Sequence, residues 1–179
     1  MSEFEYYSTD FVVLDTETTG LDSRAEIVEI SIIDKQGNTL FDSLIKPKNS
    51  IPRTAERIHG ISNADVANAK DWTDVYTQVS DILASDGRTV AIYNADYDTR
   101  IIQQTCYLYG LNMINFNSTC VMLQYAKFWG EWDDYRNNYK WQKLTNAARQ
   151  QRIAIKNAHR ALGDCLMTLA VINKMYESK

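Results

Sequence analysis

The sequence predicts an α/β domain with a mixed β-sheet, in which an antiparallel three-strand meander and parallel strands are flanked by α-helices. Three observations support this prediction. Apolar runs of strand length come first along the chain, and helical patterns then alternate with a further apolar run. Seven Gly and two Pro leave little material for a linker. With 179 residues, 45% of them hydrophobic, the chain can bury one good core, so residues 1–179 are expected to form a single domain.

The strands of the meander are expected in the first 45 residues. The Val-rich run at 11–14 is apolar throughout, which is typical of a strand that is buried on both faces. In the segment IVEISII at 27–33, alternate apolar side chains share one face. Residues 39–45 turn apolar again after the turn-like KQGN at 35–38, and this pattern predicts a hairpin.

Helices are expected in the rest of the chain, on either side of one more strand. Apolar side chains recur at helical spacing from Val75 to Leu83, and Asp86 with Gly87 would end that helix. Residues 128–141 hold five aromatic side chains by position 139 but too many polar ones for a core element, so we expect a surface loop or broken helix there. The remaining elements are a buried strand at 89–93 and helices at 98–109, 119–128 and 162–176.

Targeting and membrane signals are missing from the sequence. The N-terminal residues are acidic, and no apolar run approaches the roughly 20 residues that span a bilayer. We therefore expect a soluble, cytoplasmic protein without a membrane partner. The three cysteines form no CxxC pair and suit small buried thiols in a reducing compartment; they are Cys106, Cys120 and Cys165.

Charge is distributed unevenly along the chain. The net charge of −4 is unusual for a nucleic-acid binder, yet residues 135–163 contain no Asp or Glu and hold seven of the 19 Lys and Arg residues. Four of these cations follow at intervals of three and four residues, so they could line one side of a helix or channel that attracts phosphates. The four are Arg149, Arg152, Lys156 and Arg160, and the others are Arg136, Lys140 and Lys143.

Aromatic side chains lie among these cations. Tyr135, Tyr139 and Trp141 make a mixture with the basic residues that suits stacking on unpaired bases. The alternative is an ordinary solvated helix face with the aromatic rings packed beneath it. The burial of the rings distinguishes the two interpretations.

Two carboxylates mark the end of the first predicted strand. Asp15 and Glu17 stand two residues apart, so their side chains leave the sheet on the same face. Adjacent anions on a buried strand repel each other and resist desolvation, so something must neutralise them. Oxygen ligands are hard and suit Mg²⁺ or Mn²⁺. The alternative is that Asp15 caps the following turn through a side-chain oxygen.

Further acidic side chains occur at the starts of two later helices. Asp98 follows the strand at 89–93, where it could bind a metal or serve as a favourable charge on the helix dipole. His159 and Asp164 would point apart if both were helical, because five residues turn a helix by about 500 degrees. We therefore place Asp164 in the first helical turns and His159 on the preceding loop. His159 could instead be a surface histidine.

Together these motifs resemble the DEDDh, or DnaQ-like, family of 3′–5′ exonucleases, typified by the epsilon proofreading subunit of DNA polymerase III. LDTETTG at 14–20 matches the first family motif, and IHGI at 58–61 matches the stretch that lines the terminal-nucleotide pocket. NADYD at 94–98 resembles the second motif, and His159 with Asp164 has the His-x4-Asp spacing of the third. Residues 120–130 look more like the exonuclease X subgroup.

The resemblance implies a ribonuclease-H-like fold and a 3′–5′ exonuclease that releases nucleoside 5′-monophosphates from DNA, with single strands preferred. It implies two Mg²⁺ or Mn²⁺ ions held by Asp15, Glu17, Asp98 and Asp164, and His159 as the general base. The implied ligands of the terminal nucleotide are Thr16, Thr18, Leu21, Ile58, His59 and Asn94. Besides DNA, a polymerase or repair protein and a second copy of the chain are candidate partners.

One departure from the family and two alternative functions stay open at this point. Tyr93 and Tyr97 stand where the second motif usually has His and Phe, so aromatic packing is kept while hydrogen bonding in the pocket changes. An RNA exonuclease of the same family would trim RNA ends or degrade oligonucleotides, since the 2′-hydroxyl is sensed by details of the pocket. A non-catalytic adaptor would be expected to lose a carboxylate or the histidine, and all five are present.

Overall fold

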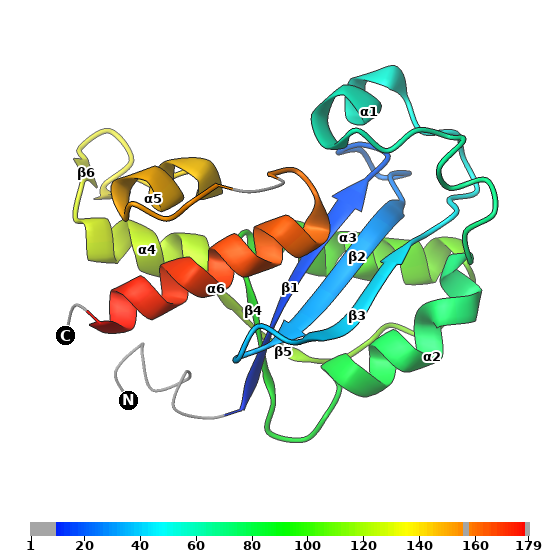
Figure 1. Ribbon diagram of the computed structural model, residues 1–179, viewed down its shortest axis with the longest axis horizontal. Helices are drawn as coiled ribbons and strands as arrows, with labels where there is room; N and C mark the ends of the chain where they lie inside the picture. Colours follow the sequence, from blue (N-terminus) through cyan, green and yellow to red (C-terminus); the bar gives the residue numbers. More distant parts are fainter. Residues whose placement is uncertain (1–9, 156–157, 178–179) are drawn as a thin grey trace.

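The computed structural model describes residues 10–155 and 158–177, and at its centre is a five-stranded mixed sheet (Figure 1). Its strands are β1 (Phe11–Thr18), β2 (Ile27–Asp34), β3 (Thr39–Leu44), β4 (Thr89–Ile92) and β5 (Asn117–Cys120). They are arranged in the order β3-β2-β1-β4-β5. The first three pair antiparallel, and β4 lies parallel to both β1 and β5. This confirms the predicted meander with added parallel strands.

Helices cover both faces of the sheet. They are α1 (Arg53–His59), α2 (Trp72–Leu83), α3 (Ala95–Leu108), α4 (Val121–Trp129), α5 (Leu144–Gln150) and α6 (Ala161–Glu177). Val12 and Leu14 of β1 pack with α2 and α3 in one core cluster, whereas Phe11 and Val13 pack with α4, α5 and α6 in another. This two-sided packing explains why the run at 11–14 is apolar throughout.

The segment expected to be a loop or broken helix, 128–141, forms a small hairpin instead. Helix α4 continues to Trp129 and ends at Gly130, whose positive φ of 79° suits glycine. The strands β6 (Trp132–Asp133) and β7 (Asn138–Tyr139) then pair antiparallel. The Asp133 carboxylate shapes the turn, because it accepts hydrogen bonds from the backbone N–H groups of Tyr135 (3.0 Å) and Arg136 (3.1 Å). Hydrogen bonds from backbone N–H groups to this side chain thus hold the hairpin, although its sequence has no alternating strand pattern.

Three smaller observations complete the comparison with the sequence. Strand β1 runs to Thr18, so both of its acidic residues lie within the strand rather than after it. Cys106 and Cys165 are buried as expected, but Cys120 is only half-buried. Among the described helices, none is long and apolar enough to cross a bilayer.

Candidate active site

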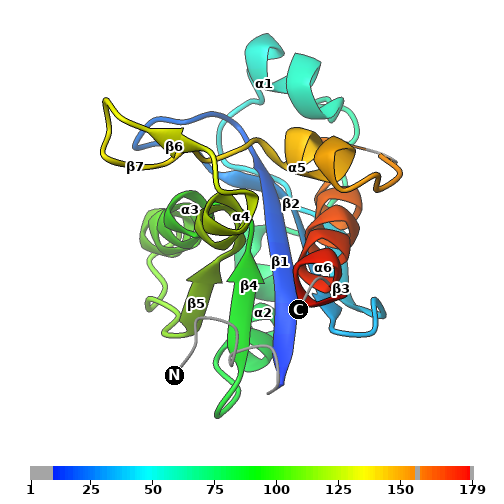
Figure 2. The ribbon, with the colours of Figure 1, turned by 90° about the vertical axis from the view of Figure 1, so that its left-hand side faces the viewer.

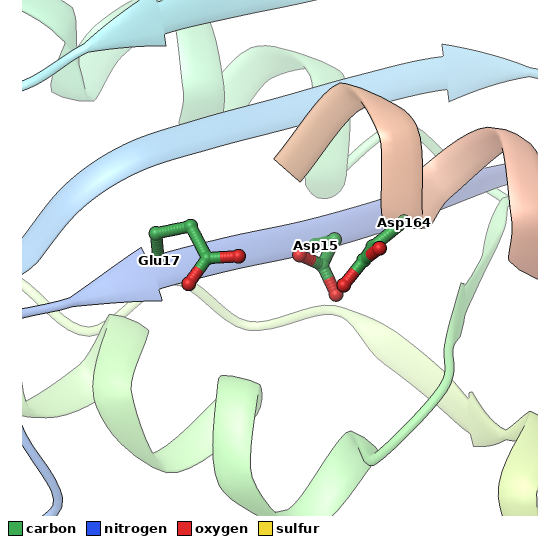
Figure 3. A group of neighbouring side chains, drawn as sticks. All are labelled: Asp15, Glu17 and Asp164. Carbon is green, nitrogen blue, oxygen red and sulfur yellow. The ribbon is translucent and has the colours of Figure 1, made fainter. Parts of the chain in front are cut away.

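Three carboxylates meet where β1 passes the start of α6. Asp15 and Glu17 project from the same face of β1, as their spacing predicts, and Asp164 comes from the first turn of α6 (Figure 3). One oxygen of each carboxylate lies within 4.8 Å of the others. Ligand atoms at this separation can share one small cation, and oxygen donors suit hard divalent ions.

A fourth carboxylate, Asp98, approaches from α3 and is buried. The Thr16 hydroxyl donates a 2.7 Å hydrogen bond to its Oδ1. Thr16 lies between the two acidic residues of β1, so this bond ties Asp98 to the same strand. Asp98 stands outside the group of three whose oxygens approach within 4.8 Å. Its charge nevertheless reaches that group, because it raises the pKa of Asp15.

Burial and mutual repulsion raise the pKa values of all four carboxyl groups. Desolvation is the largest cause in each case; it raises the pKa of Asp15 well above its usual value and that of Glu17 to about 8. The pKa of Asp98 is raised to about 7 and that of Asp164 to about 6. Acidic groups held this close without neutralising charge favour a bound cation, so the described residues fit a divalent metal site.

The loop before α6 carries His159, which is exposed and adopts a left-handed backbone conformation with φ of 64°. Its backbone N–H lies 3.3 Å from Asp164 Oδ1. As predicted, His159 stands on the loop and Asp164 lies in the first helical turn. The backbone of His159 is therefore next to the Asp164 carboxylate, and the residue is open to solvent.

This loop is fastened to the sheet by Glu29 of β2, a buried residue that pairs with Glu17 in the strand register. The Glu29 carboxylate accepts two 3.1 Å bonds from Arg160 Nε, a further bond from the second guanidinium nitrogen, and one of 2.8 Å from the Ala161 N–H. It thus satisfies a backbone donor at the start of α6. Glu29 is not among the residues predicted from the sequence, although an acid inside the apolar run IVEISII is a usable signal.

A cavity of about 610 Å³ adjoins the carboxylates, between the end of β1 and α1. Leu21 and Ile58 are exposed on it, and the buried His59 lines its wall. His59 Nδ1 accepts a 3.0 Å bond from the Ile61 N–H, which leaves the proton on Nε2 to face Thr18 O at 3.3 Å. Desolvation lowers the pKa of His59. His59 is therefore a neutral structural support for the cavity.

Tyr97 also shapes this cavity, through a hydroxyl that the usual family Phe would lack. The hydroxyl lies 2.6 Å from Thr18 Oγ1 and donates a 2.9 Å bond to Gly20 O. Tyr93, the other departure from the second motif, is buried and donates to Gln142 O at 2.9 Å. Both tyrosines therefore keep the expected packing and add bonds that hold neighbouring loops.

The residues expected at the terminal nucleotide mostly gather at this cavity. Five of them line it: Thr16, Thr18, Leu21, Ile58 and His59. Asn94 is exposed at the N-terminus of α3 and is not among the lining residues. The roles of all six stay predictions, and Asn94 has the weakest geometric support.

The row of basic residues predicted after position 149 does not form one helical face. Helix α5 ends at Gln150, and Arg152 beyond it has a positive φ of 57°. Arg160 is engaged with Glu29, and Lys156 lies outside the described residues. Arg149 and Arg152 are exposed and stay candidates for phosphate contacts.

The aromatic segment also differs from the interpretation in which its rings pack beneath a helix. Tyr135 and Trp141 are exposed, and Tyr139 is half-buried. The rings are therefore accessible to a ligand, and this observation is developed below.

A mixed sheet with an acidic cluster beside a cavity fits the class of ribonuclease-H-like nucleases. An exonuclease family model matches residues 12–172, and the chain belongs to this DEDDh, DnaQ-like family. It is 42% identical over 178 residues to an uncharacterized exonuclease, CP81, of Escherichia phage 186, covering 96% of this chain and 90% of that protein. It is 34% identical to the DNA polymerase III epsilon subunit of Rickettsia felis, covering 82% and 68%.

Solved structures agree with this assignment. Exonuclease X in complex with 5′ overhanging duplex DNA superimposes with a TM-score of 0.70 at 25% identity, covering 94% of this chain and 92% of that one. E. coli exonuclease I in complex with a dT13 oligonucleotide gives a TM-score of 0.78 at 15% identity, covering 95% of this chain and 41% of that one. The second similarity supports the fold alone.

Proposed function

We propose that this nuclease is a 3′–5′ exonuclease that hydrolyses the terminal phosphodiester bond of DNA, prefers single-stranded ends and releases nucleoside 5′-monophosphates. The observation that carries the proposal is the cavity next to the carboxylates. Its 610 Å³ suit one nucleotide, and the exposed Leu21 and Ile58 offer apolar surfaces to a base. A terminal nucleotide seated there would place its 5′ phosphate toward Asp15 and Glu17.

The four carboxylates would hold two Mg²⁺ or Mn²⁺ ions. When bound, such ions supply positive charge to the attacked phosphate, the attacking water and the leaving 3′ oxygen. Four carboxylates at −4 balance two divalent ions at +4, so an acidic site can accept a polyanion. Asp15 belongs to the group of three carboxylates, and the charge of Asp98 also acts on it, so it would be the carboxylate that both ions share.

His159 would take the proton from the attacking water, because an imidazole can act as a base near neutral pH. Its exposed position on the loop lets the ring reach a bound substrate from the solvent side. His59 is unsuited to this role because its Nδ1 already accepts the Ile61 N–H within a buried wall. The Glu29 bonds to Arg160 and Ala161 keep His159 near Asp164.

The test uses 5′-labelled single-stranded DNA, duplex DNA and RNA of the same sequence, with Mg²⁺, with Mn²⁺ and with chelator. We expect stepwise shortening of the DNA from its 3′ end, fastest for the single strand, and none in chelator. Faster shortening of RNA would assign the chain to the RNA branch of the family. Undiminished cleavage in chelator, or release of the 5′-terminal label first, would overturn the proposal.

Two acidic residues on α3 allow a substitution of a proposed metal ligand to be compared with a matched control. Asp98→Asn should abolish cleavage because it removes a buried proposed ligand. Asp96→Asn removes the same charge from an exposed side chain two residues away and should leave the rate unchanged. Equal effects of the two changes would mean that bulk charge, rather than metal binding, accounts for the loss.

A further inference from the structure

Residues 129–141, which we call the aromatic hairpin, carry an unusual amount of exposed aromatic surface. Tyr135 is 96% exposed, Trp132 49%, Trp141 47% and Trp129 41%. The fourth tryptophan, Trp72, is fully buried in the core. Exposed tryptophans are costly in solution, and their concentration in one short segment indicates a binding surface.

Contacts within the hairpin order the rings of Trp132, Tyr139 and Trp141. The rings of Trp132 and Tyr139 meet edge to face, with centroids 5.2 Å apart and an interplanar angle of 88°. The Arg136 guanidinium lies 5.9 Å from the centroid of Trp141. Rings that are already ordered lose little conformational entropy when a ligand stacks on them.

Two of the three acidic side chains of the hairpin are engaged internally, and the third, Asp134, is exposed. Lys140 Nζ bonds Glu131 at 2.9 Å, and Asp133 accepts the two backbone bonds of the turn. Between residues 135 and 160 the described chain contains no Asp or Glu. Its exposed cations there include Lys143 and Arg149. An anionic ligand that follows the hairpin toward α5 therefore meets positive charge.

The hairpin is connected to the end of the sheet that carries the carboxylates. The Tyr93 hydroxyl at the end of β4 donates to Gln142 O, directly after Trp141. Figure 2 shows β6 and β7 at the same end of the molecule as α1 and α5. In Figure 1, α1 lies above the start of α6, which carries Asp164, and β6 lies to the left of it. The cavity beside α1 and the hairpin thus lie in different directions from the carboxylates.

We propose that the aromatic hairpin is a second binding site, on which unpaired nucleotides upstream of the 3′-terminal one stack. The proposal rests on the proposed function, which puts the terminal nucleotide in the cavity beside α1. The rest of a bound strand then leaves the carboxylates in a direction away from that cavity, and the hairpin lies in one such direction. Aromatic rings can stack on every base, so this site would bind single strands of any sequence. It would not bind a duplex, in which the bases are paired and stacked on each other.

The test measures affinity as a function of strand length. Phosphorothioate oligothymidylates of two and of eight nucleotides, which resist hydrolysis, are titrated into the protein. Quenching of tryptophan fluorescence reports contact with the hairpin, because three of the four tryptophans lie there. Calorimetry gives the affinity of each strand. We expect quenching by the longer strand and little by the dinucleotide.

Substitutions at the tip of the hairpin locate the binding energy. Tyr135→Ala combined with Trp132→Ala should weaken binding of the eight-nucleotide strand about tenfold or more, and leave the dinucleotide unaffected. Tyr135→Phe with Trp132→Phe keeps two stacking rings and should restore affinity. Tyr107→Ala, at an exposed tyrosine of α3, is the control and should change neither affinity.

Two outcomes would overturn the inference: unchanged binding of the longer strand by the double alanine variant, or equal weakening for both lengths. Release of mononucleotide from unmodified dT12 with Mg²⁺ tests the proposed function separately. Normal cleavage with length-independent binding would refute the stacking site alone. Length-dependent binding without any cleavage would refute the exonuclease and leave the stacking site standing.

Discussion

The two sides of the acidic site are built in different ways. On the β1 side, Asp15 and Glu17 stand on a strand that is packed on both faces, and the hydroxyl of Thr16 fixes Asp98 beside them. On the α6 side, His159 stands on an exposed loop fastened to the sheet by Glu29. The fold itself assembles the carboxylates, whereas a few polar bonds place the histidine.

This difference implies a division of labour that mutation can separate. Changes on the β1 side should damage metal binding and chemistry together. Changes on the loop should damage chemistry and leave the metal site intact. The following predictions test that separation, in order of decreasing effect.

The largest effect is expected for His159→Ala. Loss of the general base should lower kcat by about 100- to 10,000-fold, while DNA affinity persists because the carboxylates are untouched. His59→Ala should instead raise KM, since His59 supports the wall of the nucleotide cavity. Steady-state kinetics on single-stranded DNA measures both. If His159→Ala keeps most of its turnover while His59→Ala loses it, the base is assigned to the wrong histidine.

A second prediction concerns the pH dependence of stability on the β1 side. The folded-state pKa of Glu17 is raised to about 8, so its contribution to stability is complete below its ordinary pKa and is lost as the pH rises through about 8. The metal-free protein should therefore melt at a lower temperature at pH 9 than at pH 6. Mg²⁺ should stabilise the protein more at pH 9, because it binds the ionised carboxylates.

Glu17→Gln is the control for this pH effect. The variant lacks the titrating group and should lose much of the change in melting temperature between pH 6 and pH 9. A wild-type protein that is equally stable at pH 6 and pH 9 in chelator would contradict the raised pKa.

A smaller effect is expected when the loop is loosened by Arg160→Lys. Lysine keeps the positive charge but cannot form the forked bonds to Glu29, so kcat should fall about tenfold through displacement of His159. The same change in the His159→Ala background should add no further loss. An additive loss there would show that Arg160 acts on the carboxylates or on the substrate directly.

The smallest effect is expected for Arg149→Ala combined with Arg152→Ala. If both exposed side chains contact phosphates, the slope of log affinity against log salt should fall by about one unit per lost contact. Lys35→Ala, in the exposed turn between β2 and β3, should leave the slope unchanged. An unchanged slope in the double variant would mean that these arginines are merely solvated.

Buried strands and the acidic motifs that end them could be predicted from sequence, because both follow local patterns. The apolar run before Asp15 and the placement of Asp164 in the first turn of α6 are examples. The bonds between Glu29 and Arg160 could not, because they join residues 131 positions apart. A local sequence pattern cannot indicate that two residues so far apart in the chain bind each other.

The two strands of the aromatic hairpin could not be predicted from the sequence, for another reason. Its strands are two residues long, too short for an alternating pattern, and the turn depends on the side chain of Asp133 and a positive φ at Asn137. The helical face considered for the basic row is not formed, because α5 ends at Gln150 and the spacing of the later arginines no longer corresponds to one helix. Contact of the exposed arginines with phosphates stays a prediction.

The most direct test of the division of labour is calorimetric titration of Mn²⁺ into the wild type, Asp15→Asn and His159→Ala. We expect His159→Ala to bind Mn²⁺ as the wild type does, although it is nearly inactive. Asp15→Asn should bind at least about tenfold more weakly or lose one ion, because it removes a charge that both ions are proposed to share. Wild-type affinity in Asp15→Asn, or lost affinity in His159→Ala, would contradict the account.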